Sequence, residues 1–327
     1  MTDVATVTSE DFERRTEQLR RELLAHCYQM LGSVHDAEDL VQETMLRAWR
    51  ARDQFDESRA SLRTWMYKIA TNACLTALSG RARRALPSGI GEPWDDPWQP
   101  LAGGHELPWL QPFPDAMLGT DPASALLASG RLRLALVAAM QVLPPRQRAI
   151  LILREALGLP AAEVAGVLET SAAAVNSGLQ RARARLDAIG LDEDQIGQPA
   201  DADTRATVDR YVTAFEDADI AGLKRLLADD AVLELPPYRN WYAGRDDYAV
   251  FIERVFAGRG TDWRMVPVAA NGQPAVAAYA RGPDGRYQLH TLQVFSVTAG
   301  RVGHTVVFGD PAIFGLFGLA DSVAAPG

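Results

Sequence analysis

The chain has 327 residues, of which 47% are hydrophobic and 23% are charged, and its formal net charge is −9 at pH 7. One hydrophobic core rarely organises a chain of this length, so we expect about two or three domains. The composition is that of a globular protein, and no apolar run is long enough to cross a bilayer, which argues against an integral membrane protein. The polar segment Met1 to Glu10 lacks the pattern of a secretion signal, so we expect a cytoplasmic protein.

Cysteines and basic residues limit the chemistry further. The only two cysteines, Cys27 and Cys74, fall in apolar helical patterns, so we expect no disulfide, no metal site and no cofactor. A net negative charge opposes DNA binding, because duplex affinity comes largely from Lys and Arg beside phosphates. The net charge does not describe how the charges are distributed, because arginines occur in two local clusters. These are Arg81, Arg83 and Arg84, and Arg181, Arg183 and Arg185.

Residues 12–84 predict consecutive amphipathic helices, interrupted by a turn at Gly32-Ser33. In the helix predicted over residues 35–49, apolar side chains recur at core spacing and acidic side chains follow a neighbouring edge. Acidic groups near the start of a helix also interact favourably with its dipole. Either a docking surface or an ordinary solvated face explains this acidic edge.

The next helix, predicted over residues 61–78, begins at a good N-cap, Ser61. Its spacing places Trp65 on an apolar arc and leaves Lys68 and Asn72 off that arc. Bases stack on aromatic rings and hydrogen-bond to amides, so these groups suit single-stranded DNA. A tryptophan at this spacing is equally well explained as a core residue.

A change in composition separates this domain from the rest of the chain. Residues 87–122 hold eight prolines and three tryptophans, which prevents long helices but supplies large apolar side chains. Helical periodicity then resumes and stops in a stretch rich in acidic residues. The predicted boundaries are 12–84 for the first helical domain, 85–123 for the Pro/Trp-rich linker, 124–187 for the second helical domain, 188–203 for an acidic linker, and 204–327 for the last domain.

Residues 143–186 have the pattern of a helix-turn-helix. Gly158 ends one helix, Pro160 starts the next, and Ser171 begins the last helix after a short turn. A plain helical hairpin is the alternative, but the outward side chains of the last helix suit the major groove. These candidate DNA-binding residues are Ser171, Asn176, Ser177, Gln180, Arg181 and Arg183.

Residues 204–327 begin with two short helical patterns and continue as strand-like runs, with Pro283-Asp284-Gly285 marking a hairpin turn. Helices followed by a meander predict an α+β domain. The catalytic candidates fit structural roles better, because their spacing identifies no base, nucleophile and oriented partner: His290, His304, Asp230 and Asp310. The aromatic residues that could line a pocket or fill a core are Trp241, Tyr242, Phe251, Phe256 and Trp263.

The segments DAEDLVQETMLRAW and FDESRASLRTWMYKIATNACL closely resemble region 2 of extracytoplasmic-function (ECF) sigma factors, and LPPRQR and VNSGLQRARARL resemble region 4. The resemblance implies two all-α domains, a region 2 helical bundle and a region 4 helix-turn-helix. It also implies an alternative sigma factor that binds core RNA polymerase and directs promoter recognition and transcription initiation. In one departure, Asn176 and Gly178 stand where the family often carries basic residues, so fewer phosphate contacts are expected.

By this resemblance, region 2 supplies two sets of contacts. One set binds the polymerase, whose β′ clamp and β subunits are the expected partners, and consists of Asp39, Leu40, Val41 and Gln42. The other set captures bases of the downstream promoter element once the strands part, with Asn72 at the position that holds a flipped base, and consists of Trp65, Tyr67, Lys68 and Asn72.

The last domain resembles SnoaL-like (NTF2-like) domains through RYVTAFEDADIAGLKRLLADDAVLELPP and HTLQVFSVTAGRVGHTVVFGDPAIFGLFGL. The resemblance implies a cone-shaped α+β fold in which helices cover a curved sheet and enclose a pocket. It further implies a built-in regulator, with a possible small-molecule ligand, and not an enzyme. Promoter DNA and core polymerase are therefore the expected partners, and a membrane is not.

Two other functions fit parts of the sequence. A helix-turn-helix regulator with a ligand-sensing domain leaves residues 39–42 and 65–72 unexplained. A SnoaL-like cyclase or isomerase requires a catalytic constellation that the spacing does not identify. Co-purification with core polymerase separates the sigma factor from both alternatives.

Overall fold

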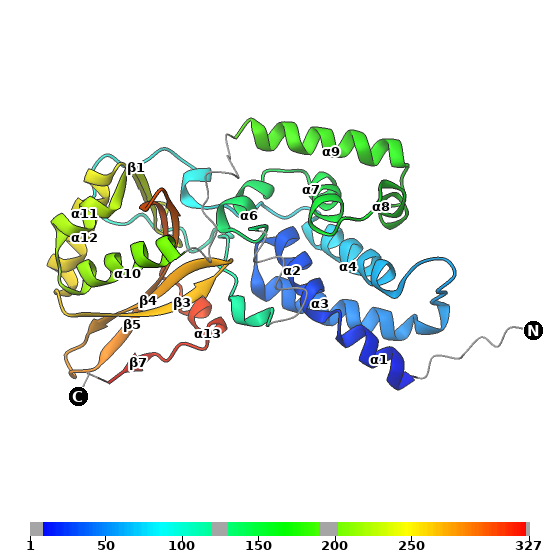
Figure 1. Ribbon diagram of the computed structural model, residues 1–327, viewed down its shortest axis with the longest axis horizontal. Coiled ribbons are helices and arrows are strands. Elements are labelled where there is room, and N and C mark those ends of the chain that lie inside the picture. Colours follow the sequence, from blue (N-terminus) through cyan, green and yellow to red (C-terminus); the bar gives the residue numbers. More distant parts are fainter. Residues whose placement is uncertain (1–8, 120–129, 190–201, 325–327) are drawn as a thin grey trace, which may run out of the picture. The chain divides into compact units, whose positions relative to one another are not determined.

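The computed structural model describes residues 9–119, 130–189 and 202–324, so most of the predicted acidic linker lies outside the described residues. The described chain divides into two compact units (Figure 1). The helical unit contains residues 9–83, 117–119 and 135–189, and the sheet unit contains residues 84–116, 130–134 and 202–324. The Pro/Trp-rich segment thus belongs mainly to the sheet unit.

The helical unit is built from short and medium α-helices whose ends follow the local sequence. Gly32 closes α2 in a left-handed conformation at φ 67°, and Ser33 caps α3 by accepting a hydrogen bond from the Asp36 amide at 3.2 Å. Ser61 caps α4 in the same way, through the Thr64 amide at 3.1 Å. The helices are α1 (Ser9–Glu17), α2 (Arg20–Leu31), α3 (Val34–Arg50), α4 (Leu62–Leu78), α6 (Leu134–Met140), α7 (Pro145–Leu151), the π-helical η4 (Ile152–Ala156), α8 (Ala161–Leu168) and α9 (Ala172–Asp187).

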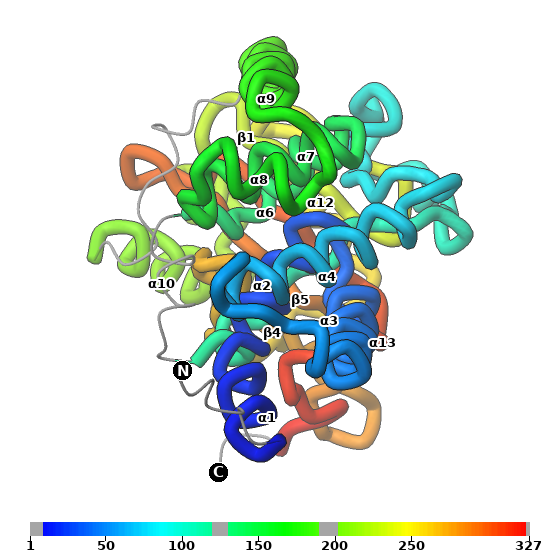
Figure 2. Tube along the Cα trace, turned by 90° about the vertical axis from the view of Figure 1, so that its right-hand side faces the viewer, coloured from blue at the N-terminus to red at the C-terminus, as the bar shows by residue number. Residues whose placement is uncertain are grey.

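The predicted helix-turn-helix is confirmed by α8 and α9, which pack against each other and lie close to α7 (Figure 2). Glu169 ends α8 in the left-handed region at φ 51°, and Ser171 caps α9 by accepting from the Ala174 amide at 3.2 Å. Val164 and Val175 are fully buried, as a helix pair that shares a core requires.

One histidine of the helical unit is buried in its core. His26 on α2 is 1% exposed, its Nε2 lies 3.0 Å from Oγ1 of Thr71 on α4, and its ring meets Tyr67 edge-on at 5.2 Å. Burial lowers the pKa of His26 from 6.5 to about 3. In the unfolded chain the His26 imidazole therefore binds a proton below about pH 6.5, whereas in the folded chain it binds one only near pH 3.

We expect this proton uptake to weaken the helical unit as the pH falls from 6.5 towards 3. At 1.36 kcal/mol per pH unit, the loss is about 2 kcal/mol at pH 5. Urea unfolding followed by helical circular dichroism at about pH 7.5 and pH 5 measures the loss. His26→Gln should reduce the pH dependence of the unfolding free energy, whereas the same change at the exposed His35 should leave it intact. The same pH dependence in wild type and His26→Gln would show that His26 does not cause it.

The sheet unit contains a seven-stranded mixed sheet in the order β2-β1-β6-β5-β4-β3, with β7 paired to β5. Neighbouring strands are antiparallel except β1 and β6, which are parallel. The strands are β1 (Leu227–Glu234), β2 (Trp241–Ala243), β3 (Trp263–Ala270), β4 (Gln273–Arg281), β5 (Tyr287–Thr298), β6 (Arg301–Phe308) and β7 (Ser322–Val323). The helices are α10 (Ala202–Glu216), α11 (Ile220–Leu226), α12 (Arg245–Arg259) and α13 (Pro311–Leu316). The predicted α+β class is thus confirmed.

The Pro/Trp-rich linker is packed onto this sheet unit. It folds back on itself, because the Leu110 amide donates to the Ala85 carbonyl at 3.1 Å and the Trp109 indole donates to the Gly104 carbonyl at 2.7 Å. Leu110 and Phe113 are fully buried. The prolines of the linker prevent long helices. Burial of its large apolar side chains stabilises its fold.

Candidate functional site

The predicted polymerase contacts lie on α3 with different exposures. Asp39 and Gln42 are exposed, Leu40 is half-buried, and Val41 is only 1% exposed and belongs to the core. Sequence reasoning missed Leu46, a large apolar side chain that is 42% exposed on the same helix. Because residues three, four and seven apart share a helical face, Leu46 lies beside Asp39 and Gln42. This face combines polar groups with an unburied apolar one.

The predicted downstream-element contacts on α4 are also split. Asn72 is exposed, and Lys68 and Trp65 are half-buried. The Trp65 ring packs against Phe12 and Phe55, with centroids at 6.3 and 5.2 Å. Tyr67 is completely buried, so its phenol reaches no surface in this conformation. Asn72 and Lys68 are therefore the accessible members of the set.

Helix α8 packs on α4 within the helical unit and places two acidic side chains there. Thr64 Oγ1 donates to Glu163 Oε2 at 3.1 Å, and Lys68 Nζ lies 3.1 Å from Glu169 Oε1. Both pairs are exposed or half-exposed, so each contributes little to stability by itself. The two carboxylates therefore occupy the Thr64 hydroxyl and the Lys68 ammonium group in this conformation.

A buried arginine joins α7 to α2. Arg148 is 2% exposed, and its guanidinium donates to the Met30 carbonyl on α2, to Gln141 Oε1 at 2.6 Å, and to the Gln141 and Leu143 carbonyls at 2.9 and 3.2 Å. Burial lowers the pKa of Arg148 to about 10, which leaves the group charged at neutral pH. Gln141 Nε2 also donates to the Gln29 carbonyl at 3.3 Å. These bonds join α7 and the residues just before it to α2 within the helical unit.

All six predicted DNA-binding residues of α9 are exposed: Ser171, Asn176, Ser177, Gln180, Arg181 and Arg183. Arg183 Nε donates to Glu155 Oε1 at 2.6 Å, which neutralises one of the cations. Gly178, in contrast, faces α7, because an added Cβ would come within 2.5 Å of Ile150 Cδ1. A side chain at position 178 would therefore require the Ile150 side chain to move.

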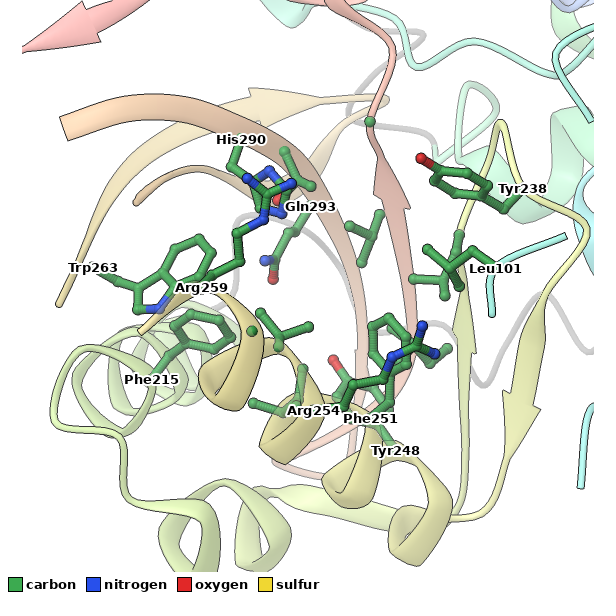
Figure 3. A pocket seen from close by; sticks show the side chains of 18 of the residues that line it. Leu101, Phe215, Tyr238, Tyr248, Phe251, Arg254, Arg259, Trp263, His290 and Gln293 are labelled. Carbon is green, nitrogen blue, oxygen red and sulfur yellow. The ribbon is translucent and has the colours of Figure 1, made fainter. Parts of the chain in front are cut away.

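The sheet unit contains a cavity of about 410 Å³. Of the four residues weighed as catalytic, only His290 lines it (Figure 3). His304 Nε2 lies 2.8 Å from Glu234 Oε1, Asp310 caps α13 through the Ala312 amide at 3.0 Å, and Asp230 is exposed. The aromatic candidates divide as well, since Phe251 and Trp263 line the cavity while the others are not among its lining residues: Trp241, Tyr242 and Phe256.

No helix in the described part of the chain has the length and apolar character that crossing a membrane requires.

Comparison with protein families gives three matches along the chain. The Sigma-70 region 2 model matches residues 16–84, the Sigma-70 region 4 model matches residues 133–186, and the SnoaL-like domain model matches residues 208–304.

Two known relatives are similar in sequence to this chain, one over nearly its whole length and one over about half of it. The chain is 47% identical over 320 residues to the ECF RNA polymerase sigma factor SigG of Mycobacterium tuberculosis, covering 96% of this chain and 85% of that protein. It is 30% identical over 161 residues to the ECF sigma factor SigW of Bacillus subtilis, covering 49% of this chain and 78% of SigW.

A solved structure extends the similarity to the fold. The crystal structure of the M. tuberculosis extracytoplasmic function sigma factor SigJ matches with a TM-score of 0.64 and 25% identity, covering 96% of this chain and all of that chain. Sigma regions 2 and 4 and the SnoaL-like domain therefore follow one another here as parts of one known kind of transcription factor. The chain belongs to the ECF RNA polymerase sigma factors, non-enzymatic initiation factors, and carries a fused SnoaL-like domain.

Proposed function

We propose that this sigma factor docks on core RNA polymerase through the exposed face of α3, against the β′ clamp, with further contacts to the β subunit. Asp39 and Gln42 supply hydrogen-bonding groups, and Leu46 supplies the apolar anchor that a protein interface needs at its centre. Val41 is buried and supports the helix from inside. Because the partner is the transcription machinery, the site of action is the cytoplasm.

The same proposal assigns promoter DNA to α4 and α9. On α4, Asn72 and Lys68 are accessible, and Trp65 lies half-buried beside them. Tyr67 contributes only if the packing around His26 changes, since its side chain is fully buried. On α9, amide, hydroxyl and guanidinium groups share the exposed surface, as a major-groove helix requires: Ser171, Asn176, Ser177, Gln180, Arg181 and Arg183.

The free factor is closed, and opening is a step in its function. Glu163 and Glu169 on α8 engage Thr64 and Lys68 on α4. Two carboxylates at this surface repel phosphates, so α8 must leave α4 before α4 can hold a promoter strand. Binding to polymerase supplies the free energy for this change, because the polymerase contacts favour the open form.

One observation supports regulation by the SnoaL-like domain: the domain holds the chain that connects regions 2 and 4. Near the start of this linker, the Ser88 amide donates to Glu234 Oε2 at 2.8 Å. Near its end, Asn271 accepts from the Phe113 amide at 2.8 Å and donates to the Leu132 carbonyl at 2.6 Å. A linker fixed in this way limits how far regions 2 and 4 can separate, so the domain restrains the factor.

Asn271→Gly tests this restraint. Asn271 occupies the β3–β4 turn at φ 59°, which glycine adopts readily. The change therefore removes the two side-chain bonds to Phe113 and Leu132, and it keeps the turn and the backbone bond to the Phe113 carbonyl. We expect transcription at limiting factor to rise roughly threefold to tenfold, equivalent to about 1 kcal/mol or more of lost restraint. Asp284→Gly, in the β4–β5 turn, is the matched control. Unchanged activity of Asn271→Gly would contradict regulation through the linker.

A further inference from the structure

The cavity of the SnoaL-like domain has the dimensions of a small-molecule site, at about 410 Å³. Its body is lined by aromatic side chains from α10, α12 and β3, namely Tyr211, Phe215, Phe251 and Trp263. Tyr211 and Tyr248 bond to each other at 2.9 Å, and Tyr248 donates to Thr305 at 2.9 Å, so their hydroxyl groups are already satisfied. These walls suit the apolar body of a ring-containing ligand.

One end of the cavity is polar, where His290 and Gln293 of β5 meet Arg259 of α12 (Figure 3). Gln293 is 5% exposed, and its Oε1 has no hydrogen-bond partner among the described residues. Leaving a buried amide oxygen unpaired is unfavourable, so this side-chain amide is available to a polar group of a ligand.

The charge of this end is positive. The lining includes Arg254, Arg259 and His290 but no aspartate or glutamate, in a chain whose net charge is −9. Burial and the neighbouring Arg259 lower the pKa of His290 to about 4, so its imidazole is neutral at pH 7. No carboxylate among the described residues forms an ion pair with the exposed Arg259, which leaves one positive charge at the polar end.

Arg254 has a different task, because it holds the linker against the cavity. Its Nη1 donates to the carbonyls of Pro97 and Gln99 at 2.7 and 2.5 Å, and the adjacent Leu101 lines the cavity. Figure 3 shows Leu101 with Tyr238 at the end away from His290. The linker is therefore one wall of the site.

We propose that this cavity binds a ring-containing monocarboxylic acid, with the carboxylate against Arg259 and the apolar body among the aromatic walls and Leu101. An arginine fork matches the two oxygens of a carboxylate, and Arg259 offers one such fork at the polar end of the cavity. A bound acid packs directly on the linker. Its occupancy therefore changes how firmly the domain holds the linker, a consequence that rests on the restraint proposed above.

The test uses the full-length protein and two fluorescent probes of one shape, 1-pyrenebutyrate and its neutral alcohol, 1-pyrenebutanol. We expect the carboxylate to bind about tenfold more tightly than the alcohol, as one charge-assisted contact predicts. Arg259→Gln should remove this preference and leave the affinity for the alcohol unchanged. Arg245→Gln, at the start of the same helix but outside the cavity lining, should preserve the preference.

Equal affinities of the two probes for wild type, or a preference that survives in Arg259→Gln, would overturn the proposal. A run-off transcription assay with and without saturating 1-pyrenebutyrate separates the site from the restraint. A change in transcription that Arg259→Gln abolishes supports both. Carboxylate-selective binding with no change in transcription establishes the site and overturns its link to the linker, whereas absent binding overturns the site itself.

Discussion

Arg148→Met should lower the free energy of unfolding of the helical unit by about 3 kcal/mol. Methionine fills a similar volume, but it leaves the carbonyls of Met30, Gln141 and Leu143 without their donor in the interior. Unpaired buried acceptors, more than lost volume, account for the expected cost. Urea unfolding followed by circular dichroism measures it.

Arg146→Met is the matched control for this substitution, because it changes the same residue type in the same LPPRQR segment. Arg146 is exposed and donates to one carbonyl, that of Leu168, so its loss should cost below about 1 kcal/mol. Similar losses for the two variants would show that Arg148 does not hold α7 to α2.

Leu46→Asp should weaken binding to core polymerase by roughly a hundredfold, because it removes an apolar anchor and places a charge in a desolvated interface. Leu46 is already 42% exposed in the free protein, so the substitution should leave the unfolding free energy nearly unchanged. Titration of purified core enzyme with fluorescently labelled factor measures the affinity.

Arg20→Ala serves as the control for Leu46→Asp, since Arg20 lies on α2, is similarly exposed and pairs only at the surface with Glu17. Its polymerase affinity should match that of wild type. If Leu46→Asp binds core enzyme as tightly as wild type does, the exposed face of α3 is not the docking surface.

The helices of regions 2 and 4 were predictable because their ends depend on neighbouring residues. Ser33, Ser61 and Ser171 each accept a hydrogen bond from an amide three residues later, so the start of each helix is encoded locally. Glycine and proline mark the remaining ends of the helix-turn-helix, at Gly158 and Pro160. Sequence reasoning therefore placed α8 and the start of α9 closely.

Features that depend on distant residues were not predictable. Helix α12 alternates buried aromatic positions such as Tyr248 and Phe256 with charged ones, and its apolar residues follow the cavity and the sheet, not a simple stripe. Strand β2 is a three-residue partner of β1. The burial of Tyr67 and the exposure of Leu46 likewise follow from the packing of whole helices, which spacing within one helix does not specify.

For the cavity, too, some features could be predicted from the sequence and others could not. Aromatic composition indicated a pocket or a core, and both occur, but which rings line the cavity depends on packing between elements that are far apart in the sequence. The role of Leu101 could not be anticipated, because a linker residue reaches this site only after the Pro/Trp-rich segment folds onto the domain. Long-range packing thus determines which residues line the cavity, and local patterns leave this open.

Promoter-specific run-off transcription with purified core enzyme tests the central claim most directly. Full-length protein added to core polymerase should produce discrete transcripts from linear genomic templates, and core polymerase alone should not. Asn72→Ala, which changes an exposed residue of α4, should reduce those transcripts by roughly tenfold or more while polymerase binding persists. Transcripts that are independent of the added protein, or unaffected by Asn72→Ala, would contradict this account of how the factor opens a promoter.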